Sequence, residues 1–438
     1  MLPARPTPLL KTPDRAELLR YFHETWRLNA WLFSAVDDDA FGEKPDPLRN
    51  PLIFYLGHTA AFYINKLAVA GLRDGGLDPD LDELLARGVD PDTSRELASF
   101  PQIALSDVRR YRAEAFSAVS DFIASMSVDG PITAEDPRWA LLMGLEHGRI
   151  HFETSSVLIR QLSLDRLTRP EGWLDAPAGG EPAPPRWLDV PGQTVALGRP
   201  GGLPTFGWDN EFGRQVVDVA PFAATADLVT NRAFLAFVQA GGYRDASLWS
   251  EAGWAWRAAH GVTRPRFWVG SDETPRYRAM FDERPMPWAW PVEVCCHEAE
   301  AFCRWAGGRL PTEAEHTALA AGAPEDERGD TPGTSAYNLS LRYGSPCPVG
   351  SMGRTPAGFS DVYGNVWQWL SDDFHPLPGF APHPYYADFS EPYFDDQHAA
   401  MIGGAWASTG ACASRFYRLW FRRHFYQHAG FRMVRTRS

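Results

Sequence analysis

The sequence predicts an α+β fold in which an N-terminal four-helix bundle precedes a mixed α/β domain rich in irregular loops. Three observations support this prediction. Residues 1–168 carry apolar repeats at helical spacing, residues 169–189 concentrate Pro, Gly and Ala, and residues 190–438 are rich in Trp, Tyr, Gly and Pro. We therefore divide the 438 residues into a helical domain, a linker and a second domain.

The helical domain is expected to contain four long helices. Apolar residues recur three and four positions apart in each of them, and prolines stand just ahead of three. The predicted helices cover residues 14–36, 53–72, about 108–126 and 139–162. Helices of this length with loops between them are typical of an up-and-down bundle.

The second domain offers fewer regular signals. Two helices are expected, at about residues 231–239 and about 294–306, among short apolar runs separated by turn residues. The segment 373–397 has no regular period, and we expect a structured loop held by its aromatic residues. Trp173 and Trp187 in the linker suggest that it packs on a surface.

Composition and charge exclude several classes of protein. Hydrophobic residues make up 44% and charged residues 22%, which is incompatible with a disordered chain. A net charge of −13 argues against nucleic-acid and anionic-membrane partners, and no apolar run is long enough to span a membrane. Prolines interrupt the opening segment before a signal core forms, and five cysteines give no disulfide framework, so we expect a cytoplasmic protein.

Three histidines in the helical domain form a candidate metal site. His147 and His151 lie four residues apart and therefore on one face of the fourth predicted helix, and His58 lies in the second. Three imidazoles suit iron, zinc, copper or nickel, and bundle interiors commonly hold such sites. The alternative is that these are ordinary core or surface histidines. Gly148 directly after His147 excludes the H-E-x-x-H zinc-protease pattern.

Five phrases of the second half resemble the formylglycine-generating-enzyme (sulfatase-modifying-factor) fold in their order along the chain. They are VTNRAFLAFVQAGGY (229–243), AFCRWAGGRLPTEAEH (301–316), DVYGNVWQW (361–369), GGAW (403–406) and AGFRMV (429–434). The first half resembles a DinB-like bundle. The two together resemble the iron-dependent sulfoxide synthases that make ergothioneine and ovothiol, and the related selenoneine synthases. This resemblance implies a nonheme iron oxidoreductase with Fe(II) on His58, His147 and His151.

Within this group, the sequence motifs most resemble those of the ovothiol-type histidylcysteine sulfoxide synthases. The matching phrases are RNPLIFYLGHTAAFYINKL, LMGLEHGRIHFETSSVLIRQL, DDFHPLPGFAPHPYYADFS and FRRHFYQHAGFRMV. Two features depart from known branches. Ovothiol-type enzymes usually continue into a methyltransferase, which we do not expect in a chain that ends at Ser438. Ergothioneine-type enzymes often place Gln before the third histidine, where this chain has Ile150.

Synthase domains without a methyltransferase, combined with motifs that resemble the ovothiol branch, are what we expect of a selenoneine synthase. The resemblance then implies Fe(II)- and O2-dependent coupling of a selenium or sulfur donor to an imidazole ring, and we favour hercynine with a selenosugar, giving a carbon–selenium bond. The alternatives are histidine with a cysteine-type thiol, giving a sulfoxide as in the ovothiol branch, and an ergothioneine-type sulfoxide synthase.

The resemblance also assigns further site residues. The family uses a tyrosine of the irregular loop as proton or hydrogen-atom donor, and this loop offers Tyr385 and Tyr386. A quaternary ammonium favours an aromatic pocket, for which Trp406, Tyr417, Trp420 and Phe421 are candidates. A substrate carboxylate favours an arginine, for which Arg415, Arg422 and Arg423 are candidates. Core packing of the rings and solvated arginines are the alternatives.

Three rival functions make different predictions. A true formylglycine-generating enzyme needs a pair of C-terminal cysteines, whereas only Cys412 lies in that region. A ligand-binding module would leave the three histidines unexplained. A zinc hydrolase built on the bundle alone would be recognised by metal analysis after anaerobic purification.

Overall fold

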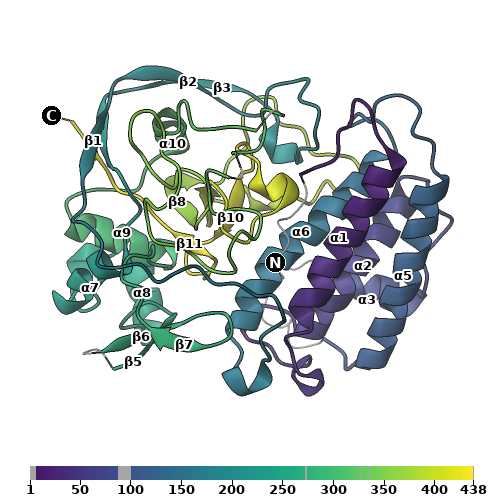
Figure 1. Ribbon diagram of the computed structural model, residues 1–438, viewed down its shortest axis with the longest axis horizontal. Coiled ribbons are helices and arrows are strands. Elements are labelled where there is room, and N and C mark those ends of the chain that lie inside the picture. Colours follow the sequence, from purple (N-terminus) through teal and green to yellow (C-terminus); the bar gives the residue numbers. More distant parts are fainter. Residues whose placement is uncertain (1–5, 87–99, 272–273, 327, 334, 438) are drawn as a thin grey trace.

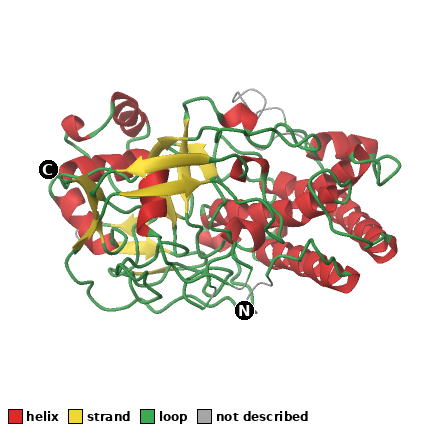
Figure 2. Cartoon of the chain, turned by 90° about the horizontal axis from the view of Figure 1, so that it is seen from above, coloured by secondary structure: helices red, strands yellow, loops and turns green. Residues whose placement is uncertain are grey.

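The computed structural model describes residues 6–86, 100–271, 274–326, 328–333 and 335–437. Long helices from the N-terminal part of the chain gather on one side of the molecule, and strands with shorter helices occupy the other (Figure 1). The view in Figure 2 shows the same separation, with irregular chain covering much of the strand-containing side. The predicted α+β architecture is thereby confirmed.

Four long helices form the bundle, as the apolar repeats predict. They are α1 (Arg15–Phe33), α2 (Leu52–Val69), α5 (Leu105–Ser125) and α6 (Trp139–Arg160). Asp14 caps α1 by accepting a hydrogen bond from the backbone N–H of Glu17, which satisfies one of the free donors of the first turn. The short helix α3 (Pro79–Leu85) was not expected, because seven residues are too few to display a helical repeat.

Two glycines allow α6 to approach its neighbours closely. A Cβ added to Gly144 would lie 2.3 Å from a ring carbon of Tyr63 on α2, and one added to Gly148 would lie 2.8 Å from the methyl group of Thr25 on α1. These glycines stand on either side of His147 along the helix. The close packing of α6 against α2 therefore fixes the distance between the histidines that the two helices carry.

Replacing Gly144 by alanine should destabilise the protein. The added methyl group overlaps the buried ring of Tyr63, and overpacking of this kind costs about 1–3 kcal/mol, which outweighs the gain of about 1 kcal/mol in helix propensity. Urea denaturation measures the change. Gly42→Ala is the matched control, because no heavy atom lies within 4 Å of a Cβ there. Equal stability of the two variants would contradict this packing.

The second region is built from short strands. A three-stranded sheet has the order β1 (Trp187–Val190), β4 (Phe222–Thr225), β12 (Val434–Thr436), and a four-stranded sheet has the order β10 (Leu419–Arg422), β9 (His398–Ile402), β8 (Trp367–Asp373), β11 (Ala429–Gly430). Further strands pair as β2 (Gln193–Leu197) with β3 (Gln215–Val219), and as β5 (Trp268–Gly270), β6 (Pro275–Arg278) and β7 (Glu283–Pro285). Only β11 pairs in parallel, with β8, among the strands described.

Four helices accompany these strands. The expected helices are present as α7 (Asn231–Gln239) and α9 (Cys296–Trp305), whereas α8 (Glu251–Ala259) and α10 (Glu313–Leu319) were missed. Beyond the end of β8 the chain to residue 397 is irregular except for one short turn of 3₁₀ helix. Stacking of Phe374 on Trp420, with 4.4 Å between the ring centroids, holds this segment to β10, as expected for a loop fixed by aromatics.

Helix α6 joins the two regions. The carboxylate of Glu153 accepts hydrogen bonds from the indole N–H of Trp367 on β8 and, at 2.6 Å, from the hydroxyl of Ser408. Near the end of α6 the Arg160 guanidinium donates to Glu293 at 2.7 and 2.8 Å. All these groups are buried, and such bonds are costly to break in a low-dielectric interior. They tie α6, and with it the bundle, to the second region.

The linker and the cysteines behave as expected. Trp173 is buried and donates through its indole N–H to the carbonyl of Gly344, so the linker packs on the surface rather than extending into solvent. All five cysteines are free thiols in the interior, three of them on or beside α9. Among the described helices, none combines the length with the apolar composition that a bilayer crossing requires.

Candidate metal centre and adjoining pocket

The three predicted histidines converge in the bundle. His58 comes from α2, and His147 and His151 come from successive turns of α6; one ring nitrogen of each lies within 4.8 Å of the other two. The Nε2 atoms of His147 and His151 are 3.1 Å apart. All three residues are at most 4% exposed. This arrangement matches the predicted constellation of three imidazoles from two helices.

Hydrogen bonding orients the His58 ring for ligation. Its Nδ1 lies 2.6 Å from the carbonyl oxygen of Leu85, at the end of α3, and a carbonyl can only accept, so Nδ1 carries the proton. The Nε2 of His58 is then left with its lone pair, buried and without a hydrogen-bond partner. In histidines that bind a metal, the ring nitrogen that does not contact the ion usually donates a hydrogen bond, often to a backbone carbonyl. The three residues therefore fit a divalent transition metal.

A second group of potential ligands lies outside this cluster. Asp373, His375 and Asp396 come close enough together to share an ion, but they are partly or fully exposed. Asp373 also accepts a hydrogen bond from Arg423. We base no metal site on this group, because exposed carboxylates are common without one.

The histidine cluster is neutral at physiological pH. Burial lowers the pKa of His58 to about 4. Burial also lowers the pKa of His147 and His151 well below the usual value, and the neighbouring imidazoles add to this because two adjacent positive charges repel. Neutral imidazole is the form that binds a metal ion, so the cluster is ready to bind without losing protons.

The metal-free protein should lose stability in mild acid. The pKa of His58 is about 4 in the folded protein and about 6.5 in the unfolded chain, so the unfolded chain binds more protons between these values. The free energy of unfolding should therefore fall as the pH drops from about 6.5 to about 4, by about 3 kcal/mol from His58 alone. Urea denaturation at several pH values measures this, and His58→Gln should show a weaker dependence. Identical pH profiles would contradict it.

A pocket of about 100 Å³ adjoins the histidines. His147 and His151 form part of its wall, and seven further aromatic rings form much of the rest. The rings belong to Tyr55, Tyr386, Phe389, Tyr393, Tyr417, Trp420 and Phe421. The pocket lies between α6 and the segments around β10, so both regions of the molecule contribute to it.

The structure separates the two candidate tyrosines. Tyr386 lines the pocket, and its ring centroid lies 6.2 Å from that of His147. The Nζ of Lys66 on α2 lies 4.2 Å from the centre of the Tyr386 ring, a cation–π contact that fixes the ring. Tyr385 instead packs beside His383 and is not among the residues that line the pocket.

The pocket-binding candidates divide in the same way. Tyr417, Trp420 and Phe421 line the pocket. Trp406 does not: it is buried in the second region, where its ring centroid lies 4.6 Å from that of His428 and 5.8 Å from that of Trp173. Its position fits the alternative of core packing.

None of the three candidate arginines lines the pocket. Arg415 pairs with Glu325, and Arg423 pairs with Glu300 at 2.6 Å and with Asp373. Arg422 lies on β10 opposite His398 and is likewise not among the lining residues. The acidic partners of Arg415 and Arg423 are far away in the sequence, so these pairings could not be predicted from the sequence.

Arg49 lines the pocket and was missed by the sequence analysis. It lies just ahead of α2 and is 8% exposed. The available signal was its place at the start of the phrase RNPLIFYLGHTAAFYINKL, which also carries His58. Because Arg49 precedes the helix, helical spacing does not show whether its side chain lies near the histidines.

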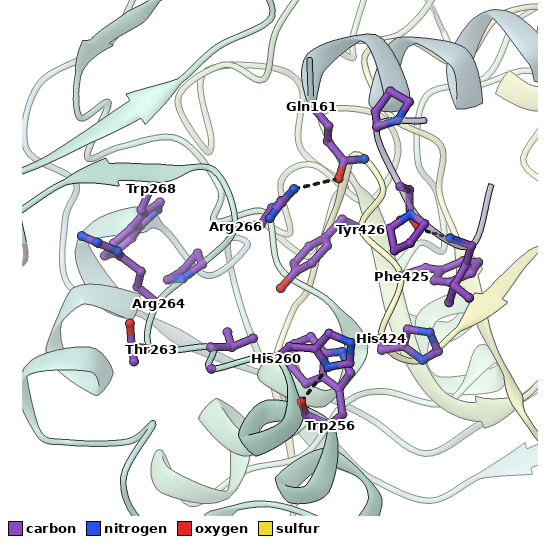
Figure 3. Close-up of a pocket in the computed structure, with 17 residues that line it drawn as sticks. Gln161, Trp256, His260, Thr263, Arg264, Arg266, Trp268, His424, Phe425 and Tyr426 are labelled. Carbon is purple, nitrogen blue, oxygen red and sulfur yellow. Dashed lines mark hydrogen bonds between the residues drawn. The ribbon is translucent and has the colours of Figure 1, made fainter. Parts of the chain in front are cut away.

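A larger open cavity of about 480 Å³ is lined in part by sequence neighbours of the residues that line the histidine pocket (Figure 3). Residues 45–48 and 424–426 form part of it, and the adjoining Arg49 and Gln427 line the histidine pocket. The hydroxyl of Tyr426 points into the space that Arg266 and His260 border. None of the three clustered histidines lines this cavity, so it is separate from the candidate metal centre.

Comparison with protein families gives two matches that follow each other along the chain. The model of the DinB superfamily matches residues 21–155. The model of the sulfatase-modifying factor enzyme 1-like domain matches residues 181–437. The first covers the bundle that carries the histidines, and the second covers the region that supplies most of the aromatic pocket residues.

Full-length relatives combine both parts. The chain is 32% identical to the hercynine oxygenase of Mycolicibacterium thermoresistibile, over 93% of this chain and 92% of the relative, and 30% identical to the hercynine oxygenase of Mycobacterium tuberculosis, over 91% and 94%. It is 23% identical to the ergothioneine biosynthesis protein 1 of Neurospora crassa, over 90% of this chain and 54% of the relative. With both domains matched in order, three converging histidines and identity extending over nearly the whole chain, the protein belongs to the nonheme iron sulfoxide synthase family and is an oxidoreductase of that family.

Proposed function

We propose that this protein is an Fe(II)- and O2-dependent sulfoxide synthase that joins the sulfur of a thiol donor to the imidazole ring of hercynine. The observation that carries the proposal is the buried cluster of three histidines that borders an aromatic pocket. The similarity to hercynine oxygenases over the full chain supports the same acceptor. The relatives' names also favour sulfur over the selenosugar expected from the sequence, because ergothioneine carries sulfur.

His58, His147 and His151 would hold the iron. They would leave about three positions of an octahedral ion free for exogenous ligands. When bound, ferrous iron supplies the redox chemistry with dioxygen and a thiolate that a new carbon–sulfur bond requires. The protein's contribution is then orientation and exclusion of water around the imidazole carbon that reacts.

The composition of the pocket favours a quaternary ammonium over a primary one. Seven Phe, Tyr and Trp rings contribute to its wall, and none of the described residues that line it is Asp or Glu. A trimethylammonium group has no N–H to satisfy and is attracted to ring faces. The primary ammonium of histidine has three N–H donors, which lose hydrogen bonds with water and find no carboxylate here. This difference supports hercynine as the acceptor.

Tyr386 is the proposed proton donor. Burial raises the pKa of its phenol, and the nearby acidic groups raise it further, so the hydroxyl stays protonated at neutral pH. It lies on the pocket wall with His147, where a proton can be delivered to the reacting centre. Tyr385, outside the lining, is the less suitable of the two.

A matrix of substrates tests the proposed function. The Fe(II)-loaded protein is offered hercynine or histidine as acceptor, each with cysteine, γ-glutamylcysteine or a selenosugar as donor, and the products are identified by mass spectrometry. We expect a sulfoxide from hercynine with a thiol. If histidine with cysteine is the only pair that reacts, the result would support an ovothiol-type enzyme instead. If the selenosugar is the only donor that reacts, it would support a selenoneine synthase.

A further inference from the structure

We propose that Asp209 positions Tyr386 for proton transfer by anchoring the irregular segment that carries it. The inference rests on the proposed function, because Asp209 reaches the reaction only through the tyrosine that is proposed as proton donor. Asp209 does not line the histidine pocket, so it is a positioning residue and not a catalytic one.

Tyr386 lies in a segment with little structure of its own. The chain between β8 and β9 is described throughout, and its one regular element is the short 3₁₀ turn Glu391–Tyr393. The backbone N–H of Tyr386 donates to the carbonyl of His383 at 2.9 Å, and that of Phe389 donates to the carbonyl of Tyr386 at 3.2 Å. Isolated turns of this kind do not offset the entropy of ordering a long segment. The position of Tyr386 therefore depends on contacts from other parts of the chain.

Asp209 supplies such contacts on both sides of Tyr386. Its carboxylate accepts a hydrogen bond from the hydroxyl of Ser390 at 2.5 Å, and the side-chain amide of Asn210 donates to the same hydroxyl at 3.0 Å. Burial raises the pKa of Asp209 to about 6, and hydrogen bonding by Ser390 and by the backbone of Asn210 and His383 opposes that rise. The carboxylate thus acts on the segment three residues before and four residues after Tyr386.

The residue before Asp209 adds an aromatic contact. The ring of Trp208 stacks on that of Phe389 with 4.1 Å between the centroids, and its centroid lies 6.4 Å from that of Tyr386. Phe389 lines the histidine pocket together with Tyr386. Trp208 and Asp209 therefore hold two successive residues, Phe389 and Ser390, on the side of the segment that borders the pocket.

The turn that carries Asp209 is itself fixed. The carboxylate of Glu211 accepts a hydrogen bond from the backbone N–H of Trp208 at 2.9 Å, which closes the turn. The guanidinium of Arg199 donates to the same carboxylate at 3.1 Å, and the backbone N–H of Arg199 donates to the carbonyl of Glu211 at 2.7 Å. All these side chains are buried, where breaking such bonds is costly. Asp209 is therefore a rigid anchor for the segment.

A fixed anchor matters because proton transfer depends on distance. A donor must lie within about 2.6–3.2 Å of the atom that takes its proton, and a displacement of about 1 Å can lower the rate about 100-fold. Lys66 contacts the face of the Tyr386 ring from the bundle, at 4.2 Å from the ring centre. A cation over a ring face does not set how far the hydroxyl extends into the pocket. The attachment of the segment to Asp209 sets that distance.

Hydrogen exchange of the metal-free protein tests the anchor without reference to the reaction. Asp209→Asn leaves one acceptor oxygen in place of two, and Ser390→Ala removes only the hydroxyl that Asp209 accepts from. Backbone amides of residues 383–393 should exchange about tenfold faster or more in both variants, while those of α6 keep the wild-type rate. Asp245→Asn is the matched control, because the exposed Asp245 accepts from the hydroxyl of Ser247 at 2.6 Å. It should leave the exchange of residues 383–393 unchanged.

Turnover in two backgrounds tests whether Asp209 acts through Tyr386. In the wild-type background Asp209→Asn and Ser390→Ala should lower formation of the coupled product by about 10- to 100-fold, with iron content and the KM for the acceptor within about twofold of wild type. In the Tyr386→Phe background the same changes should lower it less than about twofold, because the hydroxyl that they displace is already absent. Equal losses in the two backgrounds would show a general structural role and would overturn the inference.

The remaining outcomes separate the inference from the proposed function. Unchanged exchange of residues 383–393 in both variants would overturn the inference, whatever reaction the protein catalyses. Full turnover of Tyr386→Phe itself would refute the proposed proton donor and, with it, the positioning role. Absence of any coupled product from the wild-type protein would refute the proposed function, and faster exchange in Asp209→Asn and Ser390→Ala would still support the anchoring of the segment by Asp209.

Discussion

Replacing His147 by alanine should remove iron and turnover together. The variant keeps two of the three imidazoles, and His147 is the one whose Nε2 directly faces that of His151. Loss of a ligand weakens metal binding more than the roughly 10- to 100-fold effect of losing an outer hydrogen bond. We therefore expect iron content below about one tenth of the wild-type value and turnover lower by about 10³-fold or more.

A matched histidine variant controls for nonspecific effects. His260 is exposed and lies outside the cluster, so His260→Ala should keep both iron and activity. Iron is measured by elemental analysis after anaerobic loading and gel filtration, and turnover by product mass spectrometry. If His147→Ala keeps full iron content and turnover, the cluster is not the metal centre. Zinc in place of iron in the wild-type protein after anaerobic purification would favour a zinc hydrolase.

Removing only the hydroxyl of Tyr386 should produce the second large effect. Tyr386→Phe keeps the ring that Lys66 contacts, and so preserves the pocket wall while it removes the proton donor. Positioned proton transfer contributes about 10²- to 10⁴-fold to catalysis, so formation of the coupled product should fall by about 10²-fold or more. Iron content and acceptor affinity should stay within about twofold of wild type.

The adjacent tyrosine is the natural control. Tyr385→Phe makes the same chemical change one residue away, on a side chain that does not line the pocket, and it should leave turnover nearly unchanged. If instead Tyr385→Phe abolishes product formation and Tyr386→Phe does not, the assignment within the pair is reversed. If neither variant is affected, the proton comes from another group.

The histidine cluster was predictable because it depends on local spacing. Two histidines four residues apart share a helix face whatever surrounds them, and the apolar repeats place those helices in a bundle. Gly144 and Gly148 allow α6 to pack closely, and His58 on α2 therefore lies near His147 and His151. The family resemblance selected the same three residues.

The residues of the aromatic pocket were only partly predictable, because the pocket depends on long-range contacts. Neighbours in an irregular loop follow no fixed period, so the sequence could not separate Tyr386 from Tyr385. Arg415 and Arg423 are occupied by Glu325 and Glu300, which lie 90 and 123 residues earlier in the chain. The pocket instead takes its arginine, Arg49, from the bundle, on the opposite side of the linker.

X-ray absorption at the iron edge tests the central claim most directly. The wild-type protein is loaded with Fe(II) without oxygen, and the scattering around the metal is measured before any donor is added. Three imidazole nitrogen ligands with the remaining positions filled by oxygen from water are the predicted result, and His147→Ala should lose one imidazole or bind no iron. Protein sulfur in the coordination sphere, or fewer than three imidazoles in the wild-type protein, would contradict the account.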